Sequence, residues 1–151
     1  MDHEHFFNNE YIPLLQQLKG DEKGNWGVLS AQGMIEHMTD SIGVAWGRIS
    51  QPLQTPDHLL ERMRTFALGE KEFKPGTPNS LMTDTPAPLR KASIADAVSE
   101  LDNEIKNFVA YYHANPTAII TNPFFGDFNY KEWLHLLHKH AVHHLKQFSL
   151  I

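Results

Sequence analysis

The chain has 151 residues, of which 41% are hydrophobic and 21% charged, with a formal net charge of −5 and no cysteine. This length suits one domain, and the composition is that of a folded globular protein rather than a disordered one. The lack of cysteine excludes disulfides, thiolate metal sites and a cysteine nucleophile, so that histidine and carboxylate are the only good metal ligands.

Charge and hydropathy also limit the partners that we expect. Net negative charge without a block of Lys and Arg argues against nucleic acid. Nowhere do about 18 apolar residues follow one another, which argues against a membrane partner. The first residues contain no basic segment followed by an apolar run, and we therefore expect a cytoplasmic protein.

The first half of the chain predicts helices. Apolar residues recur at three- and four-residue spacings from His5 to Lys19, and Gly20 is a natural stop. A second helix is expected from the N-cap Ser30 to Ile49. A shorter helix follows Pro56 and stops near Gly69.

The stretch from Glu70 to Leu89 is rich in Pro, Thr and Gly and predicts a long loop. A connection of this length is either a lid over a functional site or a plain crossover between helices.

The second half predicts two further helices and no strand. Ser93 with Asp96, and Asn129 with Glu132, resemble capping boxes. The first opens a helix that runs to about His113, and the second opens a helix that runs from about Tyr130 to near the C-terminus. Residues 122–128 between them predict a turn with exposed aromatic side chains. The pattern as a whole predicts an all-α fold, a four-helix bundle with a short extra helix and a long crossover loop, forming a single domain over residues 1–151.

Histidine is the outlier in this composition. Ten histidines occur, and five of them fall within ten positions of the last helix: His135, His138, His140, His143 and His144. A rotation of about 100° per residue places His140 and His144 at one margin of the apolar face. The same rotation places His135, Lys139 and Lys146 on the solvent side, with His138 and His143 on flanking positions.

Two of these histidines form a candidate metal site with a third from the second helix. His140 and His144 are four residues apart, so both rings can face one ion. His37, which flanks the apolar stripe beside Met34 and Met38, is the best third ligand. Three imidazoles would leave open positions for water or substrate, as in catalytic sites. The alternative is that these histidines are rim residues that hydrogen-bond to backbone or water.

Other candidates have structural alternatives of equal or greater weight. Trp26, Trp46 and Trp133 either line a pocket or belong to the core. Glu36 and Asp40 either orient a ligand or act as a base, or are solvated helix charges. We expect the remaining histidines to be surface or capping residues: His3, His5, His58 and His113.

Three segments resemble the DinB-like superfamily of metalloenzymes: SAQGMIEHM at 30–38, HAVHHLKQF at 140–148 and NPFFG at 122–126. The last of these is similar to one subgroup. The resemblance implies a four-helix bundle with a metal, often zinc or nickel, on His37, His140 and His144. It also implies a relationship to transferases and isomerases that act with low-molecular-weight thiols. Many members have an Arg-Gly after the last histidine where this chain has Leu145-Lys146, so a role of that Arg is not carried over.

Three functions remain open from the sequence. The first is a metal-dependent enzyme, a thiol-dependent transferase or a hydrolase acting on a small molecule, in which the ion activates a water or a thiol. The second is a non-catalytic, stress-associated protein that binds a metal or small ligand. The third is a metal-free helical module that forms a homodimer.

Overall fold

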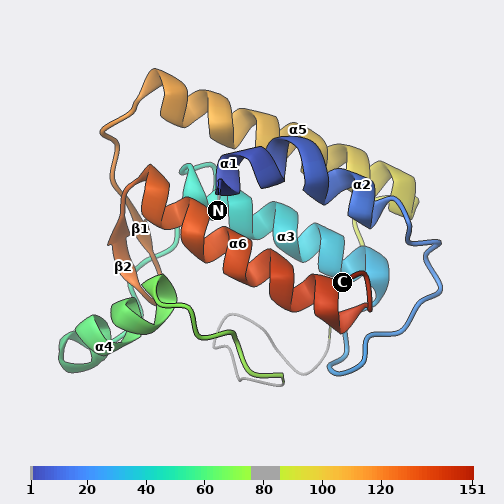
Figure 1. Ribbon diagram of the computed structural model, residues 1–151, viewed down its shortest axis with the longest axis horizontal. Helices are drawn as coiled ribbons and strands as arrows, with labels where there is room; N and C mark the ends of the chain where they lie inside the picture. The colour runs from blue at the N-terminus through green and yellow to red at the C-terminus, as the bar shows by residue number, and fades with distance from the viewer. Residues whose placement is uncertain (1, 76–85) are drawn as a thin grey trace.

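The computed structural model describes residues 2–75 and 86–151, and these are mostly helical with one small sheet (Figure 1). Part of the expected 70–89 loop therefore lies outside the described residues. The N-terminal helical stretch consists of α1 (His3–His5), the π-helical turn η1 (Phe6–Glu10) and α2 (Tyr11–Leu15). The other elements are α3 (Ala31–Ala45), α4 (Asp57–Leu68), α5 (Ile94–Ala114), β1 (Ile120–Asn122), β2 (Gly126–Phe128) and α6 (Tyr130–Gln147). None of the described helices has the length and apolar character needed to cross a membrane.

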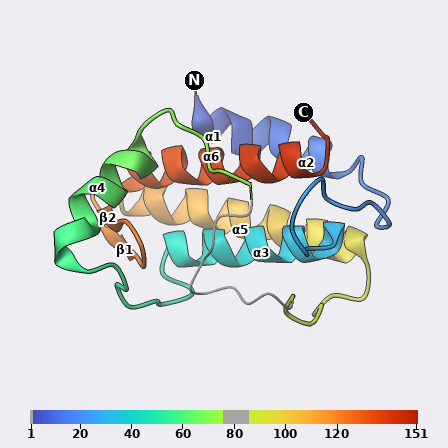
Figure 2. The same ribbon diagram turned by 90° about the horizontal axis from the view of Figure 1, so that it is seen from below.

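The N-terminal stretch, α3, α5 and α6 lie side by side along the longest axis of the molecule, while α4 and the hairpin lie at one end (Figures 1 and 2). Their apolar faces meet in a common core. Its largest fully buried side chains include Trp133, Tyr11, Tyr112, Phe108 and Phe128. The expectation of a mainly α-helical chain is thus confirmed.

The predicted caps fix where the long helices begin. The side chain of Ser30 accepts a hydrogen bond from Gly33 N, and that of Ser93 accepts one from Asp96 N. Asn129 and Glu132 form a complete capping box at the start of α6. Each cap satisfies a backbone N–H that the first helical turn leaves without a partner.

The first helix ends earlier than the apolar spacing predicted. It stops at Leu15 instead of Lys19, where Gln17 N donates to Leu14 O and Leu18 N donates to Leu15 O, so that a tighter turn replaces the α-helical pattern. The Glu22 carboxylate then accepts hydrogen bonds from Lys19 N and Gly20 N beyond this turn. The wide turn η1 precedes Pro13, which has no N–H to offer to a carbonyl four residues back and clashes with it in a regular helix.

The predicted absence of strands was wrong at residues 120–128. β1 and β2 pair antiparallel, with Asn122 opposite Gly126. The Asn122 side chain accepts hydrogen bonds from Phe124 N and Phe125 N, and Gly126 adopts φ +87°. This local turn chemistry closes a hairpin whose three-residue strands are too short to show alternation. Phe125 and Phe128 are buried and not exposed as expected.

Candidate metal centre

The structure brings together the three histidines that the sequence singled out. His37 projects from the middle of α3, and His140 and His144 project from successive turns of α6. His140 Nε2 lies 3.1 Å from His37 Nε2 and 3.0 Å from His144 Nε2. One ligand atom from each of the three rings lies within 4.8 Å of the others, so this group could hold a metal ion.

These distances match the nitrogen spacing of a metal site. With metal–nitrogen bonds of about 2.0–2.1 Å, two ligand nitrogens lie about 2.9 Å apart at a right angle and about 3.4 Å apart at the tetrahedral angle. The separations of 3.0 and 3.1 Å around His140 fall between these limits. Little movement of the rings is needed for an ion to bridge His140 to each neighbour.

Hydrogen bonding alone does not satisfy this cluster. His144 Nδ1 lies 2.7 Å from Gln147 Oε1, an atom that only accepts, so Nδ1 carries the proton and Nε2 of the neutral ring has a free lone pair. The contact between the Nε2 atoms of His140 and His144 is then a hydrogen bond only if His140 Nε2 carries a proton that points toward His144. The same proton cannot also form the hydrogen bond between His140 and His37. A cation bound to the three lone pairs would satisfy every contact.

Burial keeps the three rings neutral, the form that binds metals. It lowers the pKa of His37 to about 4 and that of His144 to about 3. For His140, burial and then the neighbouring His144 hold the pKa well below its usual range. Protons therefore do not compete for these nitrogens near neutral pH.

A family model for the DinB superfamily matches residues 13–148. The chain belongs to the DinB superfamily. The match includes all three clustered histidines and almost the whole helical framework. Neither a curated protein nor a solved structure gives a significant match to this DinB-superfamily chain.

The structure adds neighbours of the histidine cluster that the sequence did not place there. Phe73 lies against His140 and His143, with ring centroids 6.0 and 6.1 Å away. Trp26 contacts His143, with ring centroids 5.3 Å apart. Gln147 contacts His144 directly, and its position three residues further along the same helix was a usable signal. Phe73 and Trp26 come from irregular segments, which no periodicity places.

The solvent side predicted for α6 is partly covered. Lys139 was expected in solvent but is only 8% exposed. Its ammonium donates to Phe66 O at 2.6 Å and lies 4.4 Å from the centre of the Phe66 ring. His135 is half-buried, with Nε2 2.9 Å from Gly69 O. The reason is that α4 and the residue after it pack on this side of α6, whereas Lys146 is exposed as predicted.

Among the other predicted surface histidines, His5 and His58 are exposed. His113 is also exposed, and its Nε2 lies 2.5 Å from a Glu4 carboxylate oxygen. His3 differs, because it is half-buried and stacks on His138 at 4.3 Å. Trp133 is a core residue, 1% exposed.

The carboxylates beside His37 serve the framework. Glu36 is buried, and its oxygens accept from Arg90 N at 2.9 Å and from Gln32 Nε2 at 2.9 Å. Asp40 is half-exposed and pairs with Arg90 at 3.1 Å. The solvated reading of Glu36 was thus wrong, because the segment before α5 covers it.

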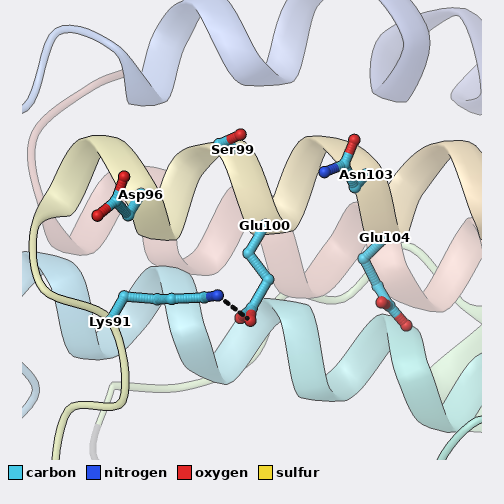
Figure 3. A pocket seen from close by; sticks show the side chains of 6 residues that line it. All are labelled: Lys91, Asp96, Ser99, Glu100, Asn103 and Glu104. Carbon is cyan, nitrogen blue, oxygen red and sulfur yellow. Dashed lines mark ion pairs between the residues drawn. The ribbon is translucent and has the colours of Figure 1, made fainter.

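A separate polar pocket of about 330 Å³ lies along α5 (Figure 3). It is lined by Lys91, Asp96, Ser99, Glu100, Asn103 and Glu104. Glu100 is paired with Lys91 at 3.2 Å and with Arg90 at 2.7 Å. Glu104 accepts from Arg48 and from the Trp46 indole. The two glutamates of the pocket, Glu100 and Glu104, are therefore already paired, and none of the three clustered histidines lines the pocket.

Proposed function

We propose that this DinB-superfamily protein binds one divalent transition metal through His37, His140 and His144 and uses it in catalysis on a small molecule. The observation that carries the proposal is the convergence of three neutral imidazoles from two helices, with Nε2 separations of 3.1 and 3.0 Å around His140. Zinc and nickel are the ions we favour, since imidazole suits both.

The proposed reaction is a thiol-dependent transfer or a hydrolysis. A metal bound here would lower the pKa of a coordinated water or thiol and so supply a nucleophile near neutral pH. Three protein ligands leave coordination positions for that group. In the transfer, sulfur bonds to an electrophilic carbon of the substrate, the thiol proton goes to solvent, and the leaving group departs with the bonding electron pair.

The chain's own contribution is to hold the ligands in place. His37 comes from α3, which packs against both α5 and α6, and His140 and His144 are set by the register of one helix. We also propose that the N-terminal stretch, α3, α5 and α6 make up a four-helix bundle and that residues 1–151 form one domain.

Metal content of untagged protein tests the site. We expect elemental analysis to give close to one zinc or nickel per chain, and expect the metal to be lost in His37→Ala and in the His140→Ala/His144→Ala pair. His58→Ala is the matched control, because His58 is exposed on α4. Wild-type protein that takes up neither ion from solution would overturn the proposal.

Turnover tests the catalytic part separately. Metal-loaded protein is assayed for transfer of low-molecular-weight thiols to electrophilic acceptors and for hydrolysis of activated esters and amides. Activity that disappears on chelation and returns with metal supports catalysis. A loaded protein that binds thiols or other small ligands without turnover would leave metal binding standing and overturn the enzymatic part.

A further inference from the structure

Gln147 lies at the end of α6, where it is only 3% exposed and contacts His144. Its side-chain amide has a hydrogen-bond partner at each end. Oε1 lies 2.7 Å from His144 Nδ1, and Nε2 donates to the backbone oxygen of Trp26 at 2.8 Å. A buried amide with both ends bonded is fixed in orientation.

The two bonds together determine the proton position on His144. The Trp26 carbonyl can only accept, so the NH₂ end of Gln147 faces it and the oxygen faces His144. An amide oxygen also only accepts, so His144 Nδ1 is the donor. The neutral ring then has its lone pair on Nε2, the atom that lies 3.0 Å from His140 Nε2.

The segment around Trp26 is shaped to fit Gln147. A Cβ at Gly24 would lie 3.0 Å from Gln147 Cγ, and a Cβ at Gly27 would lie 3.1 Å from Gln147 Nε2. Gly27 also has φ +77°, which favours glycine. Asn25 binds the same helix end, with its N donating to Gln147 O at 2.7 Å and its Nδ2 donating to Lys146 O at 3.1 Å.

We infer that Gln147 is a positioning residue that fixes His144 as the Nδ1–H tautomer and so directs its Nε2 lone pair into the three-histidine cluster. The anchor of Gln147 is the Trp26 carbonyl, which links the 24–27 segment to the candidate metal centre. The consequence for metal binding rests on the proposed function, whereas the tautomer does not. Partners of this kind set ring orientation and affinity in metal sites generally.

Three substitutions separate positioning from general stability. Gln147→Leu removes both bonds at similar size. Gln147→Glu keeps an acceptor for His144 but places a carboxylate against the Trp26 carbonyl. Asn25→Ala removes the two side-chain hydrogen bonds from Asn25 to Lys146 O and Ser149 Oγ without touching His144.

The first measurement is the tautomer of His144 in metal-free protein, by long-range ¹⁵N–¹H correlation spectra. We expect Nδ1–H in wild type, Gln147→Glu and Asn25→Ala, and a mixture or Nε2–H in Gln147→Leu. Wild-type protein with the Nε2–H tautomer would overturn the inference, whether or not any variant folds. Because no metal is present, a failure here is distinct from a failure of the proposed function.

The second measurement is zinc affinity by competition with a chelating dye, alongside thermal unfolding of the metal-free proteins. We expect Gln147→Leu to weaken zinc binding about 10- to 100-fold. Gln147→Glu and Asn25→Ala should keep wild-type affinity while unfolding at lower temperature. Affinities that follow the unfolding temperature across all three variants would show a merely structural role and overturn the positioning.

Discussion

Tyr11 and Tyr112 are two buried tyrosines of the core that differ in one respect. Tyr112 Oη donates to Ala45 O at 2.6 Å, whereas Tyr11 Oη has no hydrogen-bond partner among the described residues. Burial raises the pKa of both hydroxyls, so both are neutral. A buried hydroxyl without a partner loses its hydration and gains nothing in return.

We therefore predict that Tyr11→Phe raises the free energy of unfolding by about 1 kcal/mol, because it removes a desolvated hydroxyl and preserves the ring. Tyr112→Phe is the matched control and should lower it by about 1 kcal/mol, since the Ala45 carbonyl loses its donor. Urea unfolding of the metal-free proteins measures both. Equal losses in the two variants would mean that the Tyr11 hydroxyl is satisfied in solution.

At the scale of elements, the sequence predicted those features that depend on local spacing and caps. The N-cap of α6 at Asn129 and the close approach of the His140 and His144 rings follow from residues within one or two helical turns. The pairing of His140 with His37, 103 positions away, followed from matching two apolar faces.

The features that the sequence did not predict depend on contacts between distant segments. Lys139 looks like a solvent residue on the α6 wheel, and only the packing of α4 shows that it is covered. Glu36 is similar, because the backbone of Arg90 and Lys91 covers it from 54 and 55 positions away. Helical periodicity carries no information about such coverings.

Glu36 fastens the segment before α5 to α3. Its carboxylate accepts from three N–H groups, those of Arg90 N, Lys91 N and Gln32 Nε2. Burial would raise the pKa of Glu36, but these hydrogen bonds outweigh it and leave the pKa below the ordinary value. The carboxylate is thus ionised and serves as an acceptor for all three donors.

We predict that Glu36→Gln lowers the free energy of unfolding by about 2 kcal/mol, because one end of the amide is a donor that faces other donors. Asp102→Asn is the matched control on α5. Its carboxylate forms an exposed ion pair with Lys106 at 3.0 Å, and its loss should change stability by less than about 1 kcal/mol. Urea unfolding compares the two, and a Glu36→Gln effect no larger than the control would contradict the fastening role.

At the scale of the whole molecule, the histidine cluster links α3 to α6 and makes folding sensitive to pH. Folding places His37, His140 and His144 where protonation is disfavoured, with the pKa of His37 at about 4 against an ordinary 6.5. The unfolded chain therefore binds more protons than the folded one below about pH 6.5, and stability falls as the pH falls through that window. The lowered pKa values of His140 and His144 act in the same direction.

We predict that the metal-free protein loses stability between about pH 6.5 and about pH 5, with His37 alone contributing a loss of about 2 kcal/mol. This range lies above the ordinary pKa of carboxylates, so histidines dominate it. Urea unfolding across the range measures how steeply the free energy of unfolding depends on pH. A variant with glutamine at all three positions, His37→Gln/His140→Gln/His144→Gln, should show a smaller slope. Equal slopes for wild type and variant would show that the cluster does not set the acid sensitivity of the fold.

Zinc at about 100 times its dissociation constant should add about 2.7 kcal/mol to the free energy of unfolding of the wild type alone near pH 7. Because burial keeps the pKa values of His37 and His144 at about 4 and about 3 in the folded protein, protons do not compete with the metal in this range, and the gain should persist down to about pH 5.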